Sequence, residues 1–199
     1  MVEMVAFILS SSLRAIFKCT NSSLFLARIP EPMNNETKYT REGTADDIAM
    51  IQDIAARVWP QTYEPIVGVE QVKYMLDRFY THEALLEQLD TGHRFRIAYT
   101  NGEGIGFASF SEIQPGVYKL HKLYVAVETH GKGMGLFLMN DVVTELRKIN
   151  AQELRLNVNR YNSRAIQFYE RYGFSQLYTE DIEIGLGYQM NDYVYGLTL

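Results

Sequence analysis

The first half of the chain has the hydrophobic spacing of helices. Apolar residues recur every three or four positions after Thr44, as they do on the buried face of an α-helix. Thr44 and Asp47 form a variant of the capping box that opens such a helix, and Trp59 and Pro60 mark its expected end. Residues 69–90 then predict one or two further helices. The apolar face of the first helix consists of Ile48, Ile51, Ala55 and Val58.

Alternating apolar and polar residues predict strands elsewhere. Asn101-Gly102 stands between two such segments, and this dipeptide is typical of a tight hairpin turn. A third strand follows at once, so an antiparallel meander is expected. Gly185 and Gly187 join the last two strands. The predicted strands are a short one from Tyr39, then 95–100, 104–113, 116–127, 153–159, 174–184 and 188–199.

Two more helices lie between the later strands. The first begins within "HGKGMGLFLM" (130–139), after its three glycines, and its apolar residues repeat from Leu136 to Leu146. Asn162 is expected to cap the second, "SRAIQFYERY", which stops at Gly173. This order of strands and helices predicts an α+β fold, in which helices cover a mixed sheet.

Composition narrows the class of protein. The chain has 199 residues, of which 47% are hydrophobic, and this suits one domain with a full core. The chain has a formal net charge of -5, so it lacks the excess of basic residues that binding to nucleic acid requires. Cys19 is the single cysteine, which excludes an internal disulfide and favours a reducing, cytoplasmic location. The histidines show no metal-ligand spacing, so we predict no metal.

Residues 1–32 differ from the rest of the chain, because they are apolar and Ser-rich without clear periodicity. Their longest apolar run, 4–9, is far too short to span a membrane. Glu3 stands where a secretory signal would carry positive charge. We expect residues 1–32 to be an extension outside the domain and 33–199 to be the domain. A targeting peptide and a helix docked on the domain are the alternatives.

The glycine-rich turn indicates an anion site. Gly131, Gly133 and Gly135 lie between a strand and a helix. Successive N–H groups in such a turn, together with the positive end of the helix, bind anions, and glycine permits close approach. The turn lacks the GxxxxGK[ST] string of a P-loop, and it has GxGxG where a dinucleotide fingerprint requires GxGxxG. Neither of these two phosphate sites is therefore predicted.

Two longer segments resemble a known family. "LHKLYVAVETHGKGMGLFLM" and "LRLNVNRYNSRAIQFYERYGF" are similar to the two signatures of the GNAT superfamily of acetyl-CoA-dependent N-acetyltransferases. The resemblance runs from Tyr39 to the end of the chain and implies a central, mostly antiparallel sheet. It also implies that backbone amides of the turn bind the CoA pyrophosphate. The cofactor-binding residues that it implies are Leu123, Tyr124, Val125, His130, Gly131, Lys132, Gly133, Met134, Gly135, Asn162 and Tyr169. One departure is His130, which stands where the family has Gln or Arg.

Acetyl transfer to an amine requires a base for the nucleophile and a proton for the leaving thiolate. The resemblance makes Tyr169 the candidate acid. For the base, His121 suits by its ordinary pKa and is expected on the same strand face as Leu123 and Val125. Glu112, near the end of the preceding strand, is a second candidate, and ordered water is a third. The resemblance implies an acceptor pocket that contains Trp59, Tyr63, Tyr188, Tyr193 and Tyr195, and ordinary aromatic core packing is the alternative for these residues.

The resemblance thus implies an N-acetyltransferase that transfers acetyl from acetyl-CoA to a primary amine of a small molecule, by direct attack through a tetrahedral intermediate. A polyamine-like acceptor is the leading expectation, because the "LYV" strand and the "YxMNDYVYxL" tail resemble polyamine-type members. Acetylation of a protein N-terminus or lysine, and a CoA-binding sensor without catalysis, are the alternatives. We expect no nucleic-acid or membrane partner, and pairing into a homodimer through the C-terminal strands is an open expectation.

Overall fold

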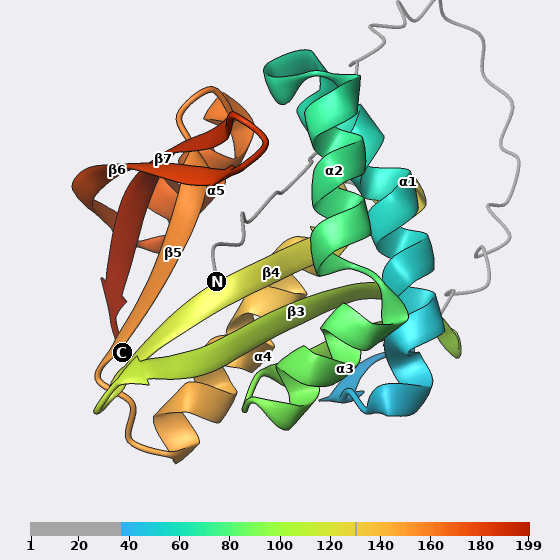
Figure 1. Ribbon diagram of the computed structural model, residues 1–199. Helices are drawn as coiled ribbons and strands as arrows, with labels where there is room; N and C mark the ends of the chain where they lie inside the picture. The colour runs from blue at the N-terminus through green and yellow to red at the C-terminus, as the bar shows by residue number, and fades with distance from the viewer. Residues whose placement is uncertain (1–36, 130) are drawn as a thin grey trace, which may run out of the picture.

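The computed structural model describes residues 37–129 and 131–199 (Figure 1). The predicted extension 1–32 and the cofactor candidate His130 lie outside the described residues. Within them the chain alternates strands and helices in nearly the predicted order. No helix in this part of the chain is long and apolar enough to cross a membrane.

The N-terminal strand and three helices come first. They are β1 (Lys38–Glu42), α1 (Ile48–Val67), α2 (Val69–Phe79) and α3 (His82–Asp90), with a short 3-10 turn, η1 (Ala45–Asp47), before α1. The predicted capping box is present, since the Thr44 N–H donates to Asp47 Oδ2 at 2.8 Å. Two separate helices fill 69–90, as the spacing allowed.

The predicted end of the first helix is wrong. Helix α1 continues through Pro60 and Pro65 to Val67. A proline removes one helical N–H donor and clashes with the preceding turn, which normally ends or bends a helix. Here Trp59 and Tyr63 on either side of Pro60 are buried in the core, so tertiary packing outweighs the local signal.

Within residues 37–129 and 131–199 the sheet has seven strands, in the order β1-β2-β3-β4-β5-β7-β6. Its later strands are β2 (Arg94–Thr100), β3 (Glu103–Gln114), β4 (Val117–Val125), β5 (Glu153–Asn159), β6 (Ser175–Gly185) and β7 (Tyr188–Thr198). The pair β4–β5 is parallel and the other neighbours are antiparallel. The expected mixed, mostly antiparallel sheet and the meander β2-β3-β4 are therefore confirmed.

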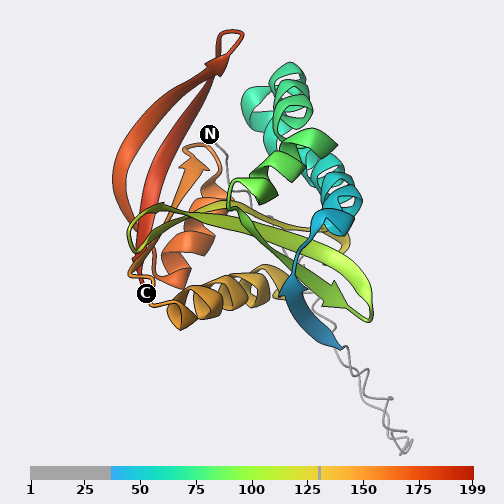
Figure 2. The ribbon, with the colours of Figure 1, turned by 60° about the horizontal axis from the view of Figure 1, so that its bottom comes forward.

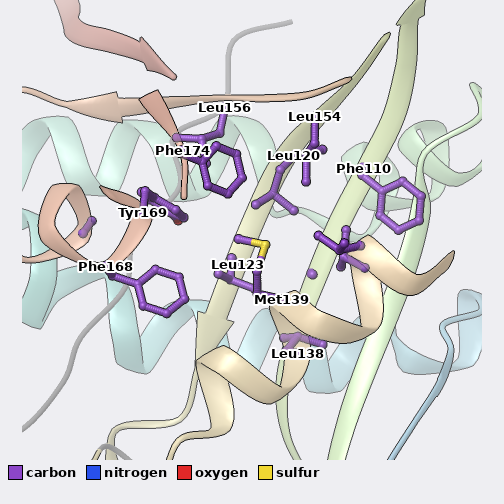
Figure 3. Packing of buried hydrophobic residues seen from close by; sticks show 14 of the residues in the cluster. Phe110, Leu120, Leu123, Leu138, Met139, Leu154, Leu156, Phe168, Tyr169 and Phe174 are labelled. Atoms are coloured by element: carbon purple, nitrogen blue, oxygen red, sulfur yellow. The ribbon is translucent and has the colours of Figure 1, made fainter. Parts of the chain in front are cut away.

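Helices cover both faces of the sheet, as Figure 2 shows. Helices α1 to α3 pack on one face, where their core includes Phe107 and Tyr124. Helices α4 (Met134–Lys148) and α5 (Ser163–Tyr172) pack on the other, where their core includes Leu120, Leu156 and Tyr169 (Figure 3). Alternation along the strands supplies one side chain to each core in turn.

Candidate active site

The site begins where β4 and β5 separate. In the described part of the chain these strands pair only over 117–120 and 153–156. Beyond that point β4 follows β3 to Val125, and β5 follows β7 to Asn159. The two strands therefore diverge, as Figure 1 shows. We call the space between 121–125 and 157–159 the β4–β5 opening.

A β-bulge lies at the same point. The register of β3 against β4 shifts between Ser109 and Phe110, which makes His121 an extra residue of β4. A bulge re-aims side chains and breaks the alternation of faces. Leu120 and Leu123 accordingly belong to the same core cluster, although they are three residues apart.

His121 points away from these leucines. Its Nε2 atom lies 2.8 Å from Ser111 Oγ, and its ring stacks on His93 with 4.2 Å between the ring centroids. Burial, and then the neighbouring His93, lower the pKa of His121 far below its usual value. The prediction that His121 shares a face with Leu123 and Val125 is wrong, because the bulge intervenes. The structure places His121 in a buried histidine pair instead of in the opening.

Glu112 lies at the closed end of the β4–β5 pair. Its Oε1 atom accepts a hydrogen bond from the Gly116 N–H at 2.9 Å, within the β3–β4 turn. Its strand partner is Tyr118, which pairs in turn with Leu154 on β5. Glu112 thus belongs to the turn, and the fold does not bring it to the opening.

The glycine-rich turn leads directly into α4. Gly131 and Gly133 have φ angles of 78° and 75°, a region that side chains rarely adopt. No side chain caps α4, and its first helical hydrogen bond runs from the Phe137 N–H to the Gly133 carbonyl at 3.0 Å. The N–H groups before Phe137 have no acceptor inside the helix. A Cβ at Gly133 would meet no atom within 4 Å, so open space lies in front of this residue.

Helix α5 and its N-cap carry three buried polar atoms without partners in the described structure, of which Arg164 Nη2 is one. Asn162 caps α5 as predicted, because its Oδ1 atom accepts from the Ala165 N–H at 3.1 Å. Its Nδ2 atom, and the Tyr169 hydroxyl, are buried and have no hydrogen-bond partner in the described structure. The Tyr169 ring packs against Phe168 and Phe174 with centroids 5.2 Å and 5.6 Å apart (Figure 3). Buried polar atoms are normally satisfied, so these two indicate a place for a ligand.

Comparison with known proteins identifies the family of this chain. Residues 50–174 match the acetyltransferase (GNAT) family. The chain belongs to the GNAT acetyltransferase family. It is 30% identical over 151 residues to an uncharacterized N-acetyltransferase of Mycobacterium tuberculosis, covering 75% of this chain and 94% of that protein.

Two further likenesses come from Thermoplasma acidophilum. The GNAT chain is 27% identical over 139 residues to its spermidine N(1)-acetyltransferase, covering 67% of this chain and 86% of that one. The structure resembles that of PaiA N-acetyltransferase in complex with coenzyme A, with a TM-score of 0.71 and 24% identity over 82% of this chain and 99% of that chain. This GNAT protein is therefore an acetyl-CoA-dependent N-acetyltransferase.

The residues on both sides of the opening fit acetyl-CoA. We propose that the N–H groups at the start of α4 hold its pyrophosphate, because a helix N-terminus with open space before it suits an anion. The main chain of 123–125 would lie along the pantetheine arm, and Asn162 Nδ2 would donate to it. The Tyr169 hydroxyl would face the sulfur. When bound, acetyl-CoA supplies the activated acetyl group.

Gly133→Ala should weaken CoA binding about 10-fold, because its Cβ enters the open space where the pyrophosphate is proposed to lie. The backbone cost of a Cβ in the left-handed region, about 1–2 kcal/mol, lowers the stability of the free and the bound protein alike. Isothermal titration with CoA measures the change. Gly187→Ala is the matched control, since Gly187 has a φ of 78° and equally open surroundings in the β6–β7 turn. Equal dissociation constants for the two variants would contradict the role of Gly133.

The expected acceptor residues divide between two faces of β7. The Tyr188 ring packs against Tyr74 of α2 in a tilted arrangement, with centroids 5.2 Å apart, on the side of α1 and α2. Tyr193 and Tyr195 face α5 instead, and the Tyr195 hydroxyl donates to Glu170 Oε1 at 3.0 Å. The three tyrosines therefore do not line one face, because β7 alternates and presents its even-numbered residues to α1 and α2. A place in the acceptor pocket on that side stays a prediction for Tyr188, Trp59 and Tyr63.

One of those even-numbered residues, Asp192, was missed by the sequence reasoning. It is fully buried, and neither carboxylate oxygen has a hydrogen-bond partner among the described residues. Burial raises the pKa of Tyr63 well above its usual value, and the nearby Tyr124, Tyr169 and Asp192 raise it further. Tyr124 on β4, Tyr169 on α5 and Asp192 on β7 therefore each lie near Tyr63 on α1. The available signal was an acid at an inward position of an otherwise apolar strand face.

Proposed function

We propose that this enzyme acetylates a primary amine of a small, polyamine-like molecule. The observation that carries the proposal is the enclosure of the acceptor side by α2. Gln71 Nε2 donates to the Gln189 carbonyl at 2.9 Å, and the Tyr74 hydroxyl donates to the Ile184 carbonyl at 2.6 Å. Helix α2 is thereby bound to the β6–β7 hairpin. A side that is closed by a packed helix suits a small amine better than the surface of a folded protein.

Buried apolar contacts reinforce this enclosure. Ile184 and Met190 of the hairpin belong to the same buried cluster as Val72 and Met75 of α2. Opening a groove for a protein substrate would expose these side chains to water, at roughly 1.5–3 kcal/mol for each large one. The closed arrangement is therefore the stable one for the free enzyme.

Aromatic rings and a carboxylate face the enclosed side. Trp59 lies 4.6 Å from Tyr63 and 6.1 Å from Tyr124, measured between ring centroids. Trp59 Nε1 and the Tyr63 hydroxyl are buried without partners in the described structure. Aromatic faces attract cations, and Asp192 adds an acid. A cationic amine complements this lining, and the relative named as a spermidine acetyltransferase agrees with it.

A thiol-release assay with acetyl-CoA tests the proposal. The panel contains spermidine, spermine, benzylamine and a short peptide with a free N-terminal alanine. We expect kcat/KM for spermidine to exceed that for the peptide by about 10-fold or more, because the binding energy of the second ammonium group is absent from the peptide. A preference for the peptide would favour protein acetylation. CoA binding without turnover of any amine would favour a sensor.

A further inference from the structure

We propose that Asp192 is the general base, which takes the proton from the acceptor ammonium group before acetyl transfer. The inference needs only that the enzyme acetylates an amine, and it holds for any acceptor in the panel. His121 and Glu112, the candidates from the sequence, lie elsewhere. The structure offers Asp192 in their place.

Asp192 is held on the correct side of the sheet. It pairs with Asn159 on β5 and with Glu180 on β6, so its position within the sheet is fixed on both sides. Cross-strand partners share a face, and Asp192 therefore lies on the same face as Asn159. Its neighbours Tyr193 and Tyr195 occupy the other face with α5. The carboxylate thus faces α1, where Tyr63 lies near it.

A structural role does not explain this carboxylate. A buried charge is ordinarily paired or hydrogen-bonded, since an isolated one is strongly destabilising. The other buried acid that the structure describes follows that rule: Asp47 accepts two bonds from Arg41, at 2.6 Å and 2.7 Å. Neither oxygen of Asp192 has an ion-pair partner or a hydrogen bond of normal geometry in the described residues. The Asn157 amide, which donates to Glu180 Oε2 at 3.0 Å, lies close enough to lower the pKa of Asp192 but does not pair with it as Arg41 pairs with Asp47. Buried ionisable groups with perturbed pKa values are concentrated at functional sites, so Asp192 is a candidate for a functional role.

The surroundings of Asp192 bring the pKa of its carboxyl group close to neutral pH. Burial raises the pKa of Asp192 to about 7, and Glu180 on β6 also raises it. The Asn157 amide, Lys119 on β4 and Arg160 after β5 act in the opposite direction. A base with a pKa near the working pH combines a substantial ionised fraction with the affinity for a proton.

The proton transfers balance with Tyr169 as the acid. The ammonium gives one proton to an Asp192 oxygen, and the freed lone pair forms the N–C bond to the acetyl carbonyl carbon. The C–S bond breaks, and Tyr169 gives its hydroxyl proton to the departing sulfur. The nitrogen then gives its second proton to the Tyr169 oxygen, which restores the hydroxyl. Asp192 releases to solvent the proton that it took from the ammonium group. The net change is one amide, one thiol and one proton.

Asp192→Asn tests the inference with the full chain. We use the panel amine with the highest turnover and measure kcat/KM against pH. The expected result is a loss of about 10-fold or more at pH 7 and the disappearance of the ionisation near pH 7. Asp181→Asn is the matched control, because Asp181 lies on the neighbouring strand β6, is exposed, and pairs with Arg160 and Asn191.

A second measurement does not depend on turnover. Removing an unpaired buried charge should raise the melting temperature at pH 8, where Asp192 is ionised, and change it little at pH 5. A carboxylate that supports the fold would give a lower melting temperature in the Asn variant. An unchanged pH profile with an active amine, or a lower melting temperature at pH 8, would each overturn the inference. Failure of the whole panel would overturn the proposed function, and a lower melting temperature of the Asn variant at pH 8 would separately overturn the inference on Asp192.

Discussion

Tyr169→Phe should lower kcat about 100-fold and leave both CoA binding and stability unchanged. General acid catalysis contributes about 10²–10⁴-fold to a rate, and the Tyr169 hydroxyl is the proton donor that we assign to the sulfur. Its pKa is raised well above the usual value, chiefly by burial. The hydroxyl therefore stays protonated at neutral pH. Burial also raises the pKa of a thiol beside it. The pKa values of the proton donor, Tyr169, and of the proton acceptor, the departing sulfur, are therefore raised together.

The stability half of the prediction follows from packing. Phenylalanine retains the ring contacts with Phe168 and Phe174, and the hydroxyl that it removes has no partner in the described structure. Steady-state kinetics, titration with CoA and thermal melting measure the three properties. Tyr172→Phe is the control on the same helix, because it removes a hydroxyl bonded to Asn140 Oδ1 at 2.9 Å. If both variants lose activity equally, Tyr169 is not the acid.

The elements of the fold were predictable where local chemistry decides them. Asn162 and Gly173 bound α5 as expected, since a side-chain cap and a left-handed C-terminal glycine act within a few residues. The end of α1 was not predictable from Pro60, because the burial of Trp59 and Tyr63 depends on strands far away in sequence. Local signals set boundaries only where tertiary packing does not oppose them.

The same distinction explains which site residues the sequence revealed. Gly133, Asn162 and Tyr169 belong to contiguous motifs, whose spacing is legible without the fold. His121 was misplaced because a single bulge reverses a face assignment that assumes strict alternation. Asp192 was missed because its meaning depends on β7 lying between β5 and β6. No spacing within the segment itself encodes that neighbourhood.

The buried histidine pair should make the fold sensitive to acid. Burial, and then the charge of Lys122, lower the pKa of His93 to about 4, and burial lowers the pKa of His121 as well. His93 Nδ1 lies 3.3 Å from Ser109 Oγ, and its ring faces His121. Below about pH 6.5 the two histidines bind protons in the unfolded chain but stay neutral in the folded chain. The unfolded state then gains protons as the pH falls, so acidification lowers the free energy of unfolding.

For His93 alone, the interval between pH 6.5 and about 4 corresponds to about 3 kcal/mol, and His121 adds to it with the same sign. Asp192 titrates in the opposite sense, because its raised pKa favours the folded state on acidification. We therefore predict a difference: between pH 7 and pH 4, wild type should lose at least about 3 kcal/mol more than the double variant His93→Gln, His121→Gln, because His121 adds to the contribution of His93. Urea unfolding at each pH measures it, and Asp192 contributes equally to both proteins. His82→Gln, an exposed position at the start of α3, should behave as wild type. Parallel pH profiles for wild type and the double variant would show that the pair is not neutral in the folded enzyme.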